Sequence, residues 1–348
     1  MNRSWWGPRA DGDQRAVLEL VDNLAASHLT RVGDDRPDGV DAARRTLAEH
    51  GLWTLGADEA GGGGGADLAT TLTALARLAG SWPALAWASV QAHAAAEVLS
   101  AAGESSSPLL ADVHQGVAAA VCALDATEGD AVELTDGRLT GLLDRVDPAG
   151  REPRLVLLLD RETAIVVPSE GVTFGPGVRR TGLDGALTVS CRIDAAVADD
   201  AVVRGAQVVR ARTFLDAGAA ALAAGIAEAA AQAALAYCVT RVQFGVPLTE
   251  LPTVRGSLSG QAAAARAALT AAVVADLDRP DEIAAALAPA CDLAVDVAAA
   301  AVQSHGGYGY MTEYLVEGLL RDAVSLRAVC RAAGATRSAA RALVGQSR

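Results

Sequence analysis

The sequence predicts a mostly α-helical protein with a small β domain inserted between two helical regions, and three observations support this. Ala dominates a chain of 348 residues in which 51% of the residues are apolar and 3% are aromatic, and Ala has the highest helix propensity. Apolar residues recur at helical spacing in the first and last parts of the chain. The middle part instead consists of short apolar runs between turn residues.

We expect an N-terminal helical domain over residues 1–115. Val17, Leu18 and Val21 follow helical spacing, and the later segment LATTLTALARLA does the same. Five consecutive glycines, Gly61 to Gly65, cannot continue a helix, so they predict a loop between these two helical segments. A phosphate-binding role for this run is the weaker interpretation, because GxGxxG spacing after a strand is missing from the sequence.

Residues 116–206 are expected to form a reduced middle β domain. The runs RLVLLLD, TAIVVPS, VTFGP and LTVSCRID are separated by Gly, Pro and Asp, as strands in a small domain are. The connections are too short to contain crossover helices, which predicts antiparallel pairing.

Residues 207–348 are expected to form a C-terminal helical bundle. Long Ala-rich runs are interrupted at Gly245 to Pro252, at Arg279 to Asp281 and at Gly306 to Gly309. These interruptions predict four or five long helices with short connections, and such helices pack as antiparallel neighbours in a bundle.

The charge of the chain excludes several function classes. The net charge is −13, and every basic residue is one of 29 arginines because the sequence contains no Lys. A lysine Schiff base and a phosphate-loop lysine are therefore excluded. An acidic chain without basic stripes argues against nucleic acid and against an anionic membrane surface. We find no stretch with the composition of a membrane span and no signal-like start, so we expect a cytoplasmic protein.

Neither the cysteines nor the histidines predict a metal site. The five cysteines are scattered and odd in number, which is typical of reduced thiols rather than of a zinc site or a disulfide framework. Four histidines in the N-terminal region lack a second ligand at metal spacing: His28, His50, His93 and His114. We interpret them as solvent-facing or packed side chains.

Two segments interrupt the Ala-rich helices with aromatic, glycine and charged residues, and function is expected at such places. The first is RVQFGVPLTELP, and the second is QSHGGYGYMTEYLVEGLLRDA. They contain an RxxFGxP element (Arg241, Phe244, Gly245, Pro247), a QxxGGxGY element (Gln303, Gly306, Gly307, Gly309, Tyr310) and an RDA triplet (Arg321 to Ala323). On these residues the chain resembles the acyl-CoA dehydrogenase family, over nearly its full length.

The resemblance implies the acyl-CoA dehydrogenase fold, an FAD cofactor, an acyl-CoA thioester substrate and an oligomer. In this family the two elements reach the FAD seated on a neighbouring subunit, which assigns FAD contacts to Arg241, Gln243, Phe244, Gln303, Gly306 and Gly307. A guanidinium, an amide and a glycine-rich backbone are groups that suit a diphosphate and an adenosine.

The resemblance also predicts where a catalytic base should lie, and there the pattern breaks. Enzymes of this family abstract a proton next to the thioester carbonyl with a Glu, which is known at two alternative positions. Counting from the motifs places Cys330 at the commoner position and Leu215 at the other. The adjacent Asp216 is the candidate base, although its side chain is one methylene shorter than that of Glu. An apolar environment would keep Cys330 protonated.

The middle domain departs from the family as well. The family's TEP segment corresponds to ALDATEGD, in which Asp125 and Thr127 are alternative counterparts of its threonine, and Asp136 to Asp160 contains no Trp. The residues that reach a neighbour's FAD are thus retained, while those that seat the chain's own flavin are changed. This predicts a degenerate subunit that completes the FAD site of a catalytic partner, as in heteromers of bacterial sterol side-chain catabolism.

Three alternatives remain open. The first is a self-sufficient homomeric dehydrogenase that uses Asp216 or another carboxylate, the second is a flavin N-hydroxylase on the same fold, and the third is a flavin-free scaffold. No motif indicates which acyl group is bound, because chain length and ring tolerance depend on pocket shape.

Overall fold

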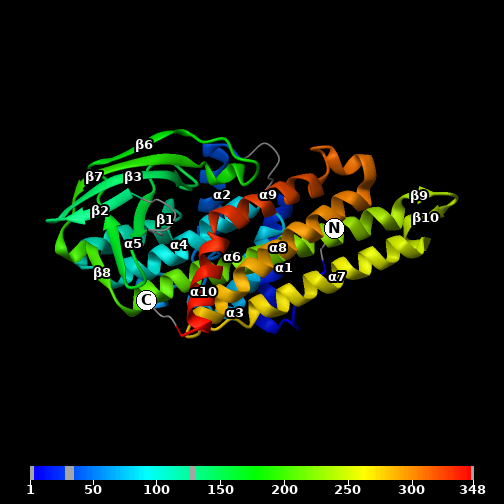
Figure 1. The fold of residues 1–348 in the computed structure, drawn as a ribbon, viewed down its shortest axis with the longest axis horizontal. Coiled ribbons are helices and arrows are strands. Elements are labelled where there is room, and N and C mark those ends of the chain that lie inside the picture. The colour runs from blue at the N-terminus through cyan, green and yellow to red at the C-terminus, as the bar shows by residue number, and fades with distance from the viewer. Residues whose placement is uncertain (1–3, 28–34, 125–130, 346–348) are drawn as a thin grey trace.

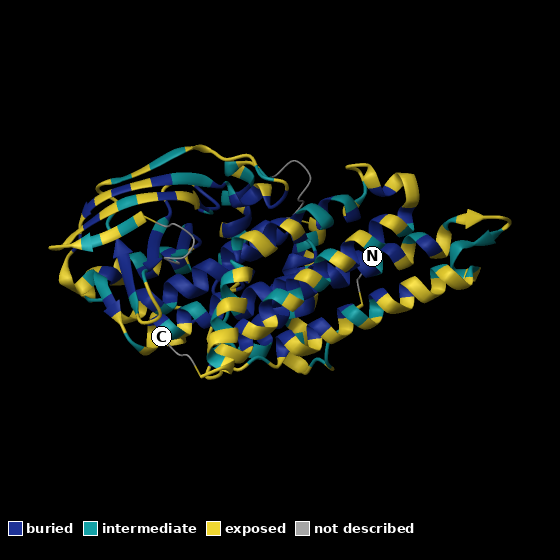
Figure 2. Ribbon diagram, in the orientation of Figure 1, coloured by how far each residue is buried: buried dark blue, intermediate teal, exposed yellow. Residues whose placement is uncertain are grey.

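The computed structural model describes residues 4–27, 35–124 and 131–345. Figure 1 shows an elongated molecule with two β-sheets at one end and helices along the rest of its length. The order along the chain is helices, then strands, then helices, as the sequence predicts. Buried residues follow the central helices, whereas exposed residues dominate the hairpin at the end opposite the sheets (Figure 2).

The N-terminal region contains the helices α1 (Gly12–Ser27), α2 (Pro37–Glu49), α3 (Leu68–Ala79), α4 (Pro83–Ala101) and α5 (Ser107–His114). Almost every residue of α3 and α4 is buried, because other helices pack against both of them on several sides. The glycine run forms the predicted loop. A short 3₁₀ turn ends at Gly61, and Gly62 and Gly65 adopt positive φ angles of 98° and 66°, which only glycine adopts without strain.

The strands form two four-stranded sheets. The strands are β1 (Ala119–Ala123), β2 (Ala131–Thr135), β3 (Arg138–Val146), β4 (Arg154–Leu158), β5 (Thr163–Val167), β6 (Val172–Gly177), β7 (Val189–Ala196) and β8 (Val202–Arg204). One sheet has the order β1-β4-β5-β8, and the other has the order β2-β3-β7-β6. Apolar side chains of both sheets form a second hydrophobic core that is separate from the helical one.

The prediction that all strands pair antiparallel is wrong for one pair. Strand β1 runs parallel to β4, with Ala119 opposite Arg154 and Ala123 opposite Leu158. The connection between them includes β2 and β3, which belong to the other sheet. A parallel pair needs a long crossover, and here strands of the second sheet supply it in place of a helix.

The C-terminal region is built around one long helix. It contains α6 (Ala206–Thr240), the two-stranded hairpin β9 (Val242–Gln243) and β10 (Val246–Pro247), α7 (Pro252–Val273), α8 (Pro280–His305), the 3₁₀ helix η7 (Gly306–Tyr310), α9 (Leu315–Val329) and α10 (Ala332–Leu343). The three interruptions predicted from the sequence coincide with the hairpin, with the start of α8 and with η7. Helix α6 packs against α3, α4, α7 and α8, so it lies at the centre of the molecule.

Among the described residues, two helical segments are long and apolar enough, by length and composition, to cross a membrane, in contrast to the sequence prediction. They are α6 and the segment Pro280–Tyr310. In the structure α6 is mostly buried among the other helices. Its apolar composition therefore serves the helical core, and a sequence without structure does not separate this case from a span.

Candidate functional site

A cavity of about 750 Å³ lies where the β region meets α4, α6 and the C-terminal end of α9. We call it the main cavity. Leu215, Asp216 and Cys330 all line it, so the structure brings both family positions for the base into one space. Helix α10 forms part of the same wall, with Gly334, Arg337, Ser338 and Arg341.

The pKa of the Asp216 carboxyl group lies close to neutral pH in this cavity. Burial raises its pKa to about 7, against the opposing effect of the Arg212 guanidinium. A carboxyl group with a pKa near the working pH is suited to general base catalysis. Asp216 therefore has the electrostatic property that proton abstraction requires.

Cys330 has the opposite property. A hydrogen bond with Cys291 and burial hold the pKa of the Cys330 thiol well above its usual range, and its position at the C-cap of α9 disfavours a negative charge. The thiol stays protonated, so Cys330 does not replace the missing Glu as a base.

The floor of the main cavity is already hydrogen-bonded within the chain. The Trp87 indole donates to the Asp147 carboxylate at 3.3 Å, and the Gln91 amide donates to the Asp147 carbonyl at 3.0 Å. The backbone N–H of Val121 donates to the Gln91 side-chain oxygen at 3.1 Å. These polar groups of α4, Asp147 and Val121 are therefore engaged within the chain. Asp125 and Thr127, the alternative threonine counterparts, lie outside the described residues.

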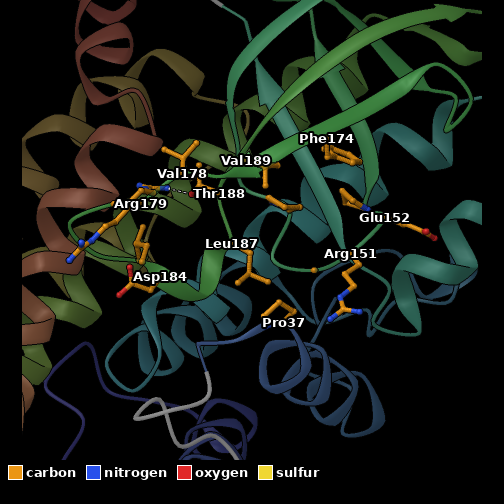
Figure 3. A pocket seen from close by; sticks show the side chains of 16 residues that line it. Pro37, Arg151, Glu152, Phe174, Val178, Arg179, Asp184, Leu187, Thr188 and Val189 are labelled. Carbon is orange, nitrogen blue, oxygen red and sulfur yellow. Dashed lines mark hydrogen bonds between the residues drawn. The ribbon is translucent and has the colours of Figure 1, made fainter.

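A second cavity, of about 450 Å³, lies between β6, β7 and the N-terminal end of α2, and we call it the side cavity (Figure 3). Its walls are mostly apolar, with Pro37 and Leu187 on one side and Phe174 on the other. Asp147 lines the main cavity, while its ion-pair partner Arg180, at 2.8 Å, lines the side cavity. This nearly buried ion pair lies between the two cavities.

The residues predicted to contact FAD meet at the opposite end of the molecule. Arg241, Gln243, Gln303, Gly306 and Gly307 line one hollow of about 830 Å³, which we call the tip hollow. Phe244 does not line it. Its side chain is 91% exposed at the turn of the β9–β10 hairpin, with a φ of 54°, and Figure 1 shows this hairpin at the far end from the sheets.

The tip hollow has features that suit a diphosphate. The Arg241 guanidinium lies over the Tyr308 ring at 5.7 Å, and no carboxylate among residues 4–27, 35–124 and 131–345 forms an ion pair with it. A Cβ atom added to Gly306 or Gly307 would meet nothing within 4 Å, so both backbones face open space. A free cation beside an accessible glycine backbone fits an anionic group.

An aromatic cluster in the wall of the tip hollow, to which Tyr237 and His305 belong, was not predicted. The Tyr237 and His305 rings stack at 4.3 Å, and Tyr314 packs edge-on against both. All four tyrosines of the chain occur in this part of the sequence, at positions 237, 308, 310 and 314. That clustering, in a chain with 3% aromatic residues, was the available signal.

The helix geometry separates the tip hollow from the main cavity of the same chain. Asp216 lies in the N-terminal third of α6 and Arg241 is its C-cap, and 25 residues at 1.5 Å per residue give about 37 Å between them. One chain therefore cannot place both groups on a single small ligand.

The N-terminal histidines that the structure describes are either exposed or engaged in packing and hydrogen bonds. His93 is buried, accepts a hydrogen bond from the Gly56 backbone at 3.0 Å and stacks on Phe214; burial lowers its pKa to about 4. His50 is exposed, and His114 contacts the Thr54 hydroxyl at 2.8 Å. His28 lies outside the described residues. The residues that the structure describes contain no group of three His, Cys, Asp or Glu side chains able to hold a metal ion.

Comparison with known proteins gives a consistent result. Residues 205–336 match the family described as acyl-CoA dehydrogenase, C-terminal domain. The probable acyl-CoA dehydrogenase YngJ of Bacillus subtilis is 35% identical over 175 residues, 46% of each chain. The short-chain specific acyl-CoA dehydrogenase of Megasphaera elsdenii is 41% identical over 112 residues, which cover 30% of this chain and 29% of that protein. The chain spans about half the length of the curated relatives it matches.

Solved structures extend the likeness to nearly the whole chain. The butyryl-CoA dehydrogenase of Megasphaera elsdenii superposes with a TM-score of 0.83 at 22% identity, covering 97% of this chain and 99% of that one. A glutaryl-CoA dehydrogenase of Mycobacterium smegmatis in complex with FADH2 superposes with a TM-score of 0.84 at 14% identity, over 97% and 96%. These likenesses confirm the fold that the motifs predict.

Proposed function

We propose that the chain is a subunit of an FAD-dependent enzyme that converts an acyl-CoA thioester to an enoyl-CoA, because residues 205–336 match the C-terminal domain of the FAD-dependent acyl-CoA dehydrogenases and the fold is like theirs. In this proposal its tip hollow completes the FAD site of a neighbouring catalytic subunit. The observation that carries it is the placement of Arg241 about 37 Å from the chain's own main cavity.

The groups of the tip hollow suit the diphosphate and adenosine parts of the cofactor. The Arg241 guanidinium would bind a phosphate, while the amides of Gln243 and Gln303 and the backbone at Gly306 and Gly307 would donate or accept hydrogen bonds. FAD, when bound, supplies the acceptor for the hydride that leaves the β-carbon of the substrate. The residues of the tip hollow would orient and retain the cofactor. A carboxylate elsewhere in the assembly would abstract the proton.

The proposal is tested by flavin retention in a complex with a complete family member. Arg241→Ala and Phe244→Ala are expected to lower the flavin that survives dialysis, because a charge-assisted phosphate contact and an exposed ring are lost. Arg255→Ala is the matched control, since Arg255 is an exposed arginine near the same hairpin that does not line the tip hollow. Equal retention by all three variants would refute the assignment.

A second candidate function is a self-sufficient dehydrogenase, and one observation favours it. Asp216 lines the main cavity, and burial raises its pKa to about 7, which is suited to removal of the proton next to a thioester carbonyl. In that case turnover falls as the pH decreases through 7, because the carboxyl group becomes protonated. Asp216→Asn with undiminished turnover would dismiss this candidate.

Purification of the chain alone separates these candidates from the remaining alternatives. A lone chain with one flavin and turnover supports the self-sufficient dehydrogenase, while flavin without acyl-CoA turnover supports an N-hydroxylase. A chain that takes up no flavin alone and adds none to any partner is a scaffold. Action on sterol side chains is part of the heteromer proposal, and it rests on the resemblance to heteromers of that pathway.

A further inference from the structure

Two cysteine thiols meet in the wall of the main cavity, and the dehydrogenation proposed above uses neither of them. Cys291 lies in α8, and Cys330 is the C-cap of α9. Their Sγ atoms are 3.7 Å apart, which is a hydrogen-bonding contact between thiols. Cys330 lines the main cavity, whereas Cys291 does not and is 1% exposed. One thiol of the pair is therefore reachable from the cavity, and the other lies behind it.

Other buried thiols of the chain are arranged differently. The Cys238 thiol donates to the Ser304 carbonyl at 3.8 Å, and the Cys191 thiol donates to the Arg192 carbonyl at 3.9 Å. None of the five cysteines forms a disulfide in this structure. The contact between Cys291 and Cys330 thus brings together two thiols that are 39 residues apart in the sequence.

We propose that Cys291 and Cys330 form a redox-active pair, which a hydroperoxide entering the main cavity converts to a reversible disulfide between α8 and the α9–α10 junction. This role is independent of which candidate function is correct, because it requires the two thiols and the cavity alone.

The geometry assigns the two thiols different parts in the reaction. Cys330 faces the cavity, so its sulfur attacks the O–O bond of hydrogen peroxide and becomes a sulfenic acid, and the first water leaves. The Cys291 sulfur then attacks the sulfenic sulfur, and the second water leaves. Two thiols lose two electrons and two protons, and one peroxide is reduced to two waters.

The groups around Cys330 determine the rate at which peroxide oxidises its thiol. Asp216 faces it from α6, Cys291 from α8 and Arg327 from α9, and Arg331 is its chain neighbour. The hydrogen bond with Cys291, burial and the charge of Asp216 all hold the pKa of Cys330 high. Because the thiolate is the nucleophile, oxidation is expected to be slow at neutral pH and to accelerate about tenfold per pH unit below that pKa.

The disulfide would add a covalent restraint to a part of the wall where α10 packs mainly against α8 and little against α9. Arg331 joins α9 to α10 with a left-handed φ of 53°, and Ala332 is the buried residue of α10. Linking Cys330 to α8 fixes this junction. A cross-link between residues 39 positions apart stabilises the folded chain because it lowers the conformational entropy of the unfolded chain. We therefore expect the unfolding temperature to rise by about 5 °C on oxidation.

The test uses the full folded chain and hydrogen peroxide, followed by tryptic digestion without reductant. The expected product is the short peptide 328–331, which contains Cys330, linked to the peptide 267–321, which contains Cys291. It should be two hydrogen atoms lighter than the two free peptides together, and dithiothreitol should separate them. Asp216→Asn is expected to form the product faster, because a negative charge beside the attacking sulfur is removed.

Two variants serve as controls. Cys291→Ala should abolish the linked peptide and leave Cys330 to oxidise further to a sulfinic acid, whereas Cys238→Ala should leave the linkage intact. Three results would overturn the proposal. They are a linkage of Cys330 to another cysteine, irreversible oxidation of Cys330 in the wild-type chain without linkage, and unreactive thiols in the folded chain at alkaline pH when the unfolded chain reacts.

Discussion

A carboxyl group inside the main cavity lowers the stability of the folded chain when it ionises. The pKa of Asp216 is about 7 in the folded chain and about 3.9 in an unfolded chain. The unfolded state therefore releases the proton first as the pH rises. The stability is full below about pH 4 and decreases as the pH approaches 7, by on the order of 4 kcal/mol.

Asp216→Asn is expected to remove this pH dependence. Above pH 7 the variant should be more stable than the wild-type chain, by on the order of 4 kcal/mol, and near pH 4 the two should be equal. Unfolding in urea across this pH range measures the difference. Asp199→Asn, at an exposed carboxylate, is the control and should leave the pH dependence unchanged. If the stability of the Asp216→Asn chain follows the wild-type curve, the raised pKa is contradicted.

A buried cluster of charges attaches the N-terminal segment to the core. Arg77 is 1% exposed and bonds Asp22 through two nitrogens at 2.6 Å. Another of its nitrogens lies 3.6 Å from the fully buried Glu228, which accepts a hydrogen bond from the Trp6 backbone at 2.7 Å. The guanidinium thus compensates two carboxylates from different helices.

Arg77→Met should be among the most destabilising substitutions in α3. It removes the cation beside the buried Glu228, and breaking a buried pair in this way typically costs about 3–5 kcal/mol. Arg138→Met removes the exposed pair with Asp194, for which the expected loss is below about 1 kcal/mol. The free energies of unfolding in urea decide between them, and similar losses for both variants would show that the buried cluster is not stabilising.

At the scale of elements, α3 and α6 cross unusually closely because Gly225 has no side chain. A Cβ atom at this position would lie 1.9 Å from the Ala76 carbonyl oxygen, where no atom fits. The requirement for glycine here comes from the contact between helices. Glycine in a helix interior otherwise lowers stability relative to alanine.

Gly225→Ala should therefore destabilise the chain by about 2 kcal/mol or more, because α3 and α6 must move apart. Gly256→Ala is the matched control in α7, where an added Cβ meets nothing within 4 Å. That substitution should stabilise the chain by about 0.5–1 kcal/mol through helix propensity. Opposite shifts of the unfolding temperature confirm the crossing, and two stabilising substitutions would contradict it.

The elements show which parts of the structure are local properties of the sequence. The helix interruptions near Gly245, Arg279 and Gly306 were predictable, because Gly and Pro act on their own backbone. The parallel pairing of β1 with β4 was not, since it depends on how two distant segments meet in space. The contact between Cys291 and Cys330 is of the same kind. The sequence motifs predicted the residues of the tip hollow. The raised pKa of Asp216 was not predictable from the sequence, because it results from burial in the folded chain.

At the scale of the whole molecule, the main cavity and the tip hollow lie toward opposite ends of the long axis. The main cavity lies beside the sheets, and the tip hollow lies near the hairpin that Figure 1 shows at the other end. Side chains near the hairpin are apolar and exposed, among them Val239, Val242, Phe244 and Tyr310. Exposed apolar groups that are gathered in this way are typical of a surface covered by another subunit.

The state of the isolated chain follows from this arrangement. Each chain offers one tip hollow, and its own main cavity has a floor whose polar groups already bond within the chain. We therefore expect the chain expressed alone to retain little FAD, to lack dehydrogenase turnover and to self-associate through the exposed apolar tip. Co-expression with a complete family member should instead give a soluble, yellow and active assembly.

Flavin absorbance against protein mass, with light scattering for the size of the assembly, measures both expectations. A mixed pair should hold one FAD, because one catalytic cavity faces one tip hollow, and a homodimer of the lone chain should hold close to none. Arg241→Ala in the co-expressed assembly provides the control, since it should lower flavin content without changing the mass of the assembly. A lone chain that holds one FAD per chain and turns over an acyl-CoA would establish the self-sufficient enzyme and end the heteromer proposal.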